Sequence, residues 1–266
     1  MKKIISYQHS NISYSISGKG KVVVLLHGFG EDSQIFSSQK KELQKVCCLI
    51  IPDLPGSGLS ELLHYKKEIL LTDYADAIYA ILVSENITSC ILLGHSMGGY
   101  ITLHFAEKYS ALLLAFGLIH SSAFEDSEEK KLIRKKGIEI IEEYGAVHFL
   151  KNTTPNLFAE DFRKNQFNKI QNLLNKTSYF KKESLQQYLK AMMLRKDKTY
   201  VLASSTVPVL FILGTEDVAA PLNDVLKQTY LPNCTYIHIL EKVGHMSMLE
   251  DENKLNELLL NFIESI

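Results

Sequence analysis

The chain has 266 residues, 46% of them hydrophobic, with 29 basic and 30 acidic side chains. These values are typical of a globular protein and exclude a disordered, collagen-like or coiled-coil chain. A net charge of −1 gives no electrostatic reason to expect nucleic acid as a partner. No apolar run approaches the roughly 20 residues that a bilayer requires, and polar residues directly follow Met1–Ile5. We therefore expect a cytoplasmic protein with no membrane partner and no signal peptide.

Short runs of Val, Ile and Leu alternate with helical patterns over the first 120 residues. Continuous apolar runs of this kind are typical of strands buried on both faces of a parallel sheet. After an opening hairpin over 3–8 and 12–17, the expected strands are Val22–Leu26, Cys47–Ile51, Cys90–Leu93 and Leu112–Ile119. The expected helices cover residues 35–46, residues 74–84 with Thr72 or Asp73 as N-cap, and the segment from Gly99 to about Tyr109.

The strand signal disappears between residues 121 and 205, where charged residues occur at helical spacing. It returns at Val207–Leu213 and Tyr236–Leu240, and helices are expected over about 222–230 and 250–264. Strands that alternate with helices imply βαβ units and a mostly parallel sheet. We predict an α/β fold formed by residues 1–120 and 206–266, with an all-helical insertion over 121–205.

The strongest chemical motif is Gly94-His95-Ser96-Met97-Gly98, which lies between a buried strand and a helix. A sharp turn there needs small neighbours and lifts the Ser96 hydroxyl clear of the sheet. The Met97 N–H then lies at a helix N-terminus, where partial positive charge favours an oxyanion. We predict that Ser96 is a nucleophile, and that the adjacent His95 is structural because its side chain should point away.

A serine hydroxyl becomes nucleophilic when a histidine takes its proton and an acid orients that histidine. Asp217 and His245 each follow a buried strand, at the sheet edge where parallel strands present functional groups. They are the predicted acid and base, and Glu216 is the competing acid. The loop His27-Gly28-Phe29-Gly30 ends the first buried strand, and Phe29 should donate a second oxyanion N–H and line the substrate pocket.

Motifs for nucleotide and metal binding are absent. Neither G-x-G-x-x-G nor G-x-x-x-x-G-K-[ST] occurs, and the four cysteines lack metal-ligand spacing. We expect no cofactor and no metal. Asp53, in the segment Asp53-Leu54-Pro55-Gly56-Ser57-Gly58, is expected to bind loop amides in a structural role.

Taken in chain order, these segments resemble the α/β-hydrolase fold superfamily. The resemblance rests on the Phe29 loop, the Asp53 segment, the Ser96 motif, Gly214-Thr215-Glu216-Asp217 and Gly244-His245, and it spans nearly the whole chain. It implies an eight-stranded sheet with an antiparallel second strand. It also implies a Ser96–Asp217–His245 triad, a helical cap over about 121–205, and hydrolysis of a small ester-type substrate through an acyl-enzyme.

Several narrower functions compete with the ester hydrolase. A serine nucleophile argues against epoxide and haloalkane hydrolysis, whereas a thioesterase or a C–C bond hydrolase could use the same triad. Tyr100 stands where the menaquinone-pathway lyases carry arginine, and Met246 stands where C–C hydrolases commonly carry tryptophan. A non-catalytic ligand-binding protein of the same fold is the alternative from another class. The sequence leaves the oligomeric state open.

The insertion carries residues that could select the substrate. Its arginines, which could bind an anionic substrate, are Arg134, Arg163 and Arg195. The basic cluster Lys130–Lys136 is expected to be a solvated helix face. Met192–Leu194 is expected to belong to the core of the insertion.

Overall fold

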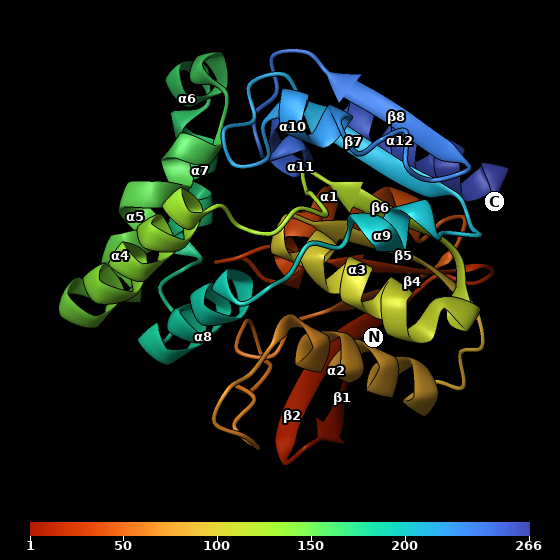
Figure 1. Ribbon diagram of the computed structural model, residues 1–266, viewed down its shortest axis with the longest axis horizontal. Helices are drawn as coiled ribbons and strands as arrows, with labels where there is room; N and C mark the ends of the chain where they lie inside the picture. Colours follow the sequence, from red (N-terminus) through yellow and green to blue (C-terminus); the bar gives the residue numbers. More distant parts are fainter.

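The computed structural model describes residues 1–266 and contains one eight-stranded sheet (Figure 1). The strand order is β1-β2-β4-β3-β5-β6-β7-β8, and β2 pairs antiparallel with both of its neighbours. All other pairings are parallel, so the predicted mostly parallel sheet is confirmed. The strands are β1 (Lys2–Tyr7), β2 (Ser10–Ser17), β3 (Val22–Leu26), β4 (Cys48–Pro52), β5 (Cys90–His95), β6 (Leu113–Ile119), β7 (Val209–Gly214) and β8 (Thr235–Leu240).

Helices cover both faces of the sheet because its central strands are apolar on both sides. Val23 and Val24 are consecutive in β3, yet they belong to two different hydrophobic clusters, as alternating side chains of a strand must. The cluster around Val24 includes α2 and α3, and the cluster around Val23 includes α1 and α12. The helical elements of this core are η1 (Ser33–Phe36), α1 (Ser37–Leu43), α2 (Leu71–Ser84), α3 (Met97–Tyr109), η2 (Ser110–Leu112), α10 (Leu222–Leu226), α11 (Ser247–Glu250) and α12 (Glu252–Ser265).

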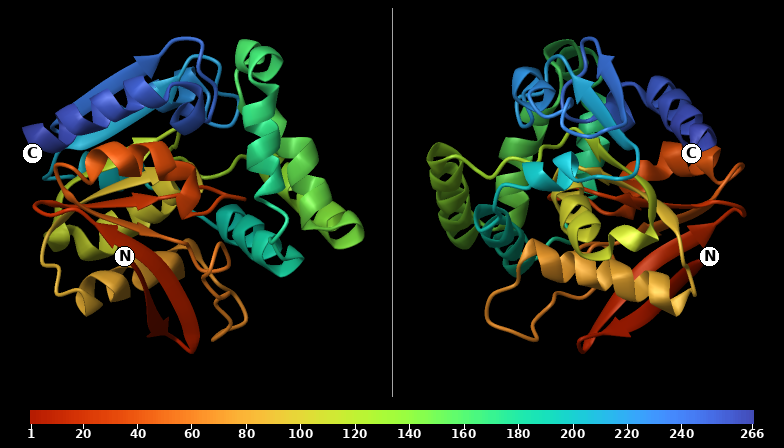
Figure 2. Two further views of the ribbon diagram at one scale, coloured as in Figure 1. Left: turned by 180° about the vertical axis from the view of Figure 1, so that it is seen from behind. Right: turned by 45° about the vertical axis from the view of Figure 1, so that its right-hand side comes forward.

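Residues between β6 and β7 form a separate group of helices without a strand. These two strands are parallel neighbours, as predicted for strands that flank an insertion. Figures 1 and 2 show α4 to α8 as a layer standing beside the sheet rather than on either face. The elements are α4 (Glu128–Tyr144), α5 (Ala146–Thr153), η3 (Thr154–Leu157), α6 (Glu160–Asn165), α7 (Phe167–Asn175), α8 (Lys182–Met193) and α9 (Thr199–Ala203).

The start of α2 differs from the prediction. The helix begins at Leu71 with Leu70 as N-cap, so neither Thr72 nor Asp73 is the capping residue. Asp73 instead occupies the third helical position, and its carboxylate accepts the Leu70 N–H at 2.7 Å. A carboxylate at that position can accept a hydrogen bond from an unpaired N–H of the first turn. An acidic residue therefore marks the start of α2, as predicted, but it lies inside the helix and not at the N-cap.

No helix in the chain is both long enough and apolar enough to cross a bilayer.

Candidate active site

Ser96 forms a strained turn between β5 and α3. Its backbone has φ 50° and ψ −116°, a left-handed conformation that non-glycine residues rarely adopt. A Cβ on Gly94 would lie 2.2 Å from the Gly98 carbonyl oxygen, and one on Gly98 would lie 2.4 Å from the Leu26 oxygen. The glycines of the motif are therefore needed where the backbones approach closely. The turn leaves Ser96 half-buried between two fully buried neighbours.

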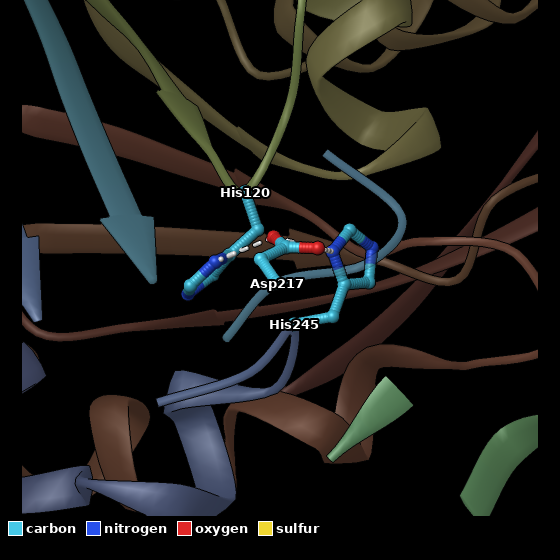
Figure 3. Close-up of side chains that lie close together, drawn as sticks. All are labelled: His120, Asp217 and His245. Carbon is cyan, nitrogen blue, oxygen red and sulfur yellow. Dashed lines mark hydrogen bonds and ion pairs between the residues drawn. The ribbon is translucent and has the colours of Figure 1, made fainter. Parts of the chain in front are cut away.

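Asp217 and His245, from the loops after β7 and β8, form a hydrogen-bonded pair (Figure 3). The His245 Nδ1 lies 2.9 Å and 2.8 Å from the two carboxylate oxygens of Asp217. Both residues are buried, and Asp217 also accepts the backbone N–H groups of Ala219 and Ala220 at 2.9 Å and 2.8 Å. The competing acid, Glu216, is exposed and accepts the Glu160 N–H instead.

Charge and hydrogen bonding keep Asp217 ionised. Burial by itself would raise the pKa of this carboxyl, but the charge of His245 and the donors around it lower the pKa well below its usual range. Hydrogen bonds join Asp217 to His245, but none joins His245 to the Ser96 hydroxyl. Contacts between a nucleophile and its base often tighten only when a substrate binds.

The Phe29 loop passes directly beside Ser96. A Cβ on Gly28 would lie 2.9 Å from the His95 Nδ1 and 3.2 Å from the Ser96 Cβ, so a larger residue would have to displace these side chains. The Gly28 N–H is used by the Glu31 carboxylate at 2.7 Å. The N–H groups of Phe29 and Met97, in contrast, donate no hydrogen bond within the protein. The two predicted oxyanion donors are therefore free on the two segments that flank Ser96.

A model of the Alpha/beta hydrolase family matches residues 23–258. The chain belongs to this family. A 2-hydroxy-6-oxononadienedioate/2-hydroxy-6-oxononatrienedioate hydrolase of a Pseudomonas species is 22% identical, over 98% of this chain and 96% of that protein. An esterase of Thermogutta terrifontis has a TM-score of 0.93 at 22% identity, over 100% of this chain and 98% of that structure.

One further match is shorter. An uncharacterized protein of Mycobacterium tuberculosis is 28% identical over 101 residues, which is 38% of this chain but only 29% of that protein. The likeness to the solved esterase, at 22% identity, shows a shared fold.

Helices of the insertion contact the loops that carry the site of this α/β hydrolase. The Phe29 ring packs edge-on against Phe149 of α5 and Tyr188 of α8, with ring centroids 6.1 Å and 6.3 Å apart. The His245 backbone N–H donates to the Leu157 carbonyl of η3 at 2.7 Å. The insertion thus touches both the predicted oxyanion loop and the loop of the predicted base.

Two of the three arginines of the insertion are engaged by a buried carboxylate. Arg134 and Arg195 both contact the buried Asp126, at 2.6 Å and 2.8 Å. The Arg195 guanidinium also stacks 3.9 Å from the Tyr100 ring centroid. Arg163 is exposed and lies next to Asn156. Asp126 therefore neutralises Arg134 and Arg195, whereas Arg163 keeps an unpaired charge at the surface.

Asp53, His95 and the segment Met192–Leu194 were predicted to have structural roles. Asp53 accepts the N–H groups of Ser33 and Leu59, both at 3.0 Å, which confirms its role in binding loop amides. His95 is fully buried and contacts Glu31, as expected for a structural residue. Met192 is buried with the core, whereas Leu194 is 44% exposed, so the prediction that both belong to the core of the insertion was wrong for Leu194. Leu194 follows the last turn of α8, where the chain leaves the packed helix.

Sequence reasoning missed two residues near the site, Glu31 and His120. His120 directly follows β6, and its Nδ1 lies 3.0 Å from Asp217 (Figure 3). Its position after a buried strand is the same signal that pointed to Asp217 and His245. The three residues offer ligand atoms within 4.8 Å of one another, a spacing that a metal ion could use. A metal ion at this place would need the Nδ1 lone pairs of both histidines. In this structure both Nδ1 atoms face the Asp217 carboxylate, to which they donate hydrogen bonds. The three side chains therefore fit a hydrogen-bonded group better than a metal site.

Proposed function

We propose that this α/β hydrolase cleaves a small ester through an acyl-enzyme on Ser96. The observation that carries the proposal is the buried Asp217–His245 pair, which lies at the sheet edge where the strained turn presents Ser96. Asp217 fixes the His245 tautomer, so that Nε2 is left to accept a proton from the nucleophile.

The residues support both halves of the reaction. The Ser96 Oγ attacks the ester carbonyl carbon while His245 takes the hydroxyl proton, and the carbonyl oxygen becomes an oxyanion. In this proposal the free N–H groups of Phe29 and Met97 stabilise that charge. Collapse of the intermediate breaks the carbon–oxygen bond, and His245 returns the proton to the departing alcohol. Water activated by His245 then attacks the acyl carbonyl and releases the acid and the Ser96 hydroxyl.

An ester is favoured over the other bonds that the same triad could cleave. An alcohol leaves with less help from an acid than an amine or a carbanion does. The similar Pseudomonas protein is named for hydrolysing a dioate, which carries two carboxylates, but Arg134 and Arg195 here are engaged by Asp126. The Thermogutta protein is an esterase of the same fold. A C–C bond hydrolase or a thioesterase is the second candidate, because the triad geometry alone does not distinguish the bonds.

We further propose that residues 121–205 form a cap on a core made of residues 1–120 and 206–266. Contacts of Phe149 and Tyr188 with Phe29, and of Leu157 with His245, support this division. A cap at this edge would exclude water and select substrates by shape. The apolar rings around Phe29 suit an apolar acyl or alcohol group of a small-molecule substrate.

Labelling with a fluorophosphonate probe tests the proposal, because only an activated serine reacts. The parent protein should be labelled and should hydrolyse p-nitrophenyl esters, and Ser96→Ala should do neither. Unreactive parent protein would favour the non-catalytic ligand-binding alternative. Labelling that persists in Ser96→Ala would place the nucleophile elsewhere.

A further inference from the structure

Asp217 contacts two histidines rather than one. His120, at the end of β6, has its Nδ1 3.0 Å from Asp217 Oδ2, and His245 has its Nδ1 2.8 Å from the same oxygen. The His120 side chain is completely buried. Figure 3 shows the two rings on either side of the carboxylate. His120 and Asp217 follow β6 and β7, which are neighbouring strands of the sheet, so the fold brings the two residues to the same edge.

The surroundings of His120 indicate that this contact is the reason for a histidine at the position. Its backbone has φ 50°, a left-handed conformation that is costly for a residue with a Cβ. Its other ring nitrogen, Nε2, is buried and has no hydrogen-bond partner. Most buried polar side-chain atoms in folded proteins have a hydrogen-bond partner, so this orphaned nitrogen calls for a reason. Here the hydrogen bond to Asp217 is the single polar interaction that the ring makes.

His120 donates this hydrogen bond as a neutral ring. Burial, the largest effect, lowers its pKa to about 4, although Asp217 favours the charged form. At neutral pH the single proton of the neutral ring therefore sits on Nδ1. Nε2 then carries no proton and needs no hydrogen-bond acceptor. A neutral donor stabilises the Asp217 carboxylate without adding a charge to the site.

We propose that His120 is a positioning residue of the triad, whose Nδ1–H orients the Asp217 carboxylate and weakens its hold on protonated His245. The inference rests on the proposed function for its catalytic meaning. Each donor that Asp217 accepts spreads its negative charge over one more partner. Less negative charge then remains to stabilise the His245 imidazolium. His245 therefore releases its proton more readily, and its imidazole remains an unprotonated base down to a lower pH.

Other charged groups surround the two histidines, and they are the same in every variant of residue 120. The His95 ring centroid lies 4.9 Å from that of His245 and 6.1 Å from that of His120. Glu31 contacts His95, and Glu250 accepts the N–H groups of Gly244 and Met246 on either side of His245. Since a change at residue 120 alters none of these groups, differences between variants report on the His120–Asp217 bond.

The experiment compares His120→Leu with His120→Asn by ¹⁵N NMR of the histidine side chains over a pH titration. Leucine fills the space without a donor, whereas the asparagine amide can replace the Nδ1–H and tolerates the left-handed backbone. The titration midpoint of His245 should rise by about 0.5 to 1 pH unit in the Leu variant, the size expected for one lost hydrogen bond. The Asn variant should return toward the parent value. If the Leu variant does not fold, the adaptable side chain of His120→Met serves the same purpose.

Two results would overturn the inference. One is an unchanged His245 midpoint in the donor-free variant, and the other is an equal shift in the Asn variant, which would assign the effect to packing. The NMR titration needs no turnover, so it can be judged even if fluorophosphonate labelling disproves the proposed function. In a protein that is labelled, the acid limb of the labelling rate should move to higher pH together with the NMR midpoint.

Discussion

The Glu31 carboxylate accepts a hydrogen bond from His95, with 3.0 Å between Oε2 and Nδ1. The other nitrogen of the ring, Nε2, lies 2.9 Å from the His245 carbonyl oxygen. Both ring nitrogens therefore face acceptors, which requires a protonated His95 beside an ionised Glu31. Because the same Glu31 oxygen accepts the Gly28 N–H, this buried ion pair joins the Phe29 loop to the His245 loop beneath Ser96.

Replacing one member of the ion pair should destabilise the protein. Glu31→Gln removes the negative charge that His95 faces in a buried position, and we expect a loss of about 1–3 kcal/mol in the free energy of unfolding. Urea denaturation between pH 4.5 and 6.5, where both groups are charged, measures it. The exposed Glu129→Gln is the matched control and should change the free energy little. If Glu31→Gln and Glu129→Gln change the free energy of unfolding by the same amount, Glu31 and His95 do not form an ion pair.

The stability difference between the parent and Glu31→Gln should depend on pH. Burial by itself opposes both charges, but the mutual attraction raises the pKa of His95 above 6.5 and lowers that of Glu31 below 4.5. The His95 contribution is complete below pH 6.5 and is lost as the pH rises through its raised pKa. The Glu31 contribution is complete above pH 4.5 and is lost as the pH falls through its lowered pKa. Denaturation curves should therefore differ most between pH 4.5 and 6.5, and a constant difference across the range would contradict the pairing.

The proposed acid can be tested against its neighbour. Asp217→Asn preserves shape but favours the wrong His245 tautomer, so kcat should fall about 10⁴-fold, by analogy with serine proteases. Glu216→Gln should have a much smaller effect, since its side chain faces the Glu160 N–H. Steady-state hydrolysis of a p-nitrophenyl ester measures both, and the reverse ranking would move the acid to Glu216.

Removal of the proposed nucleophile should separate activity from stability. Ser96→Ala loses one oxygen at a half-buried turn, so the thermal unfolding midpoint should stay close to that of the parent. Ester turnover should fall by at least about 10⁴-fold, because triad members act as a unit. A variant that unfolds at a much lower temperature would show that the turn depends on the hydroxyl for its structure.

The cap proposal predicts an effect on substrate choice. Phe149→Ala shortens a side chain that packs against Phe29, so kcat/KM for p-nitrophenyl octanoate should rise relative to that for the acetate. Lys135→Ala, on the exposed side of α4, should leave the ratio unchanged. If Phe149→Ala leaves the ratio unchanged as well, α5 does not line the acyl site.

Much of the core and of the candidate site was predictable from the sequence because the signals are local. Buried strands appear as continuous apolar runs, and the Ser96 turn needs glycines at fixed positions because its backbones nearly touch. The start of α2 was misplaced, since Asp73 can stabilise the first turn from inside the helix as well as from its cap.

The chain by itself determined the order of the strands along the sequence, the turn at Ser96 and the strand-end positions of Asp217 and His245. Only the tertiary structure decided which side chains meet. Glu31 reaches His95, His120 reaches Asp217, and Asp126 occupies two arginines of the insertion. The first two contacts join residues 64 and 97 positions apart. Their formation depends on the packing of neighbouring strands and loops, for which no periodicity or local spacing carries a signal.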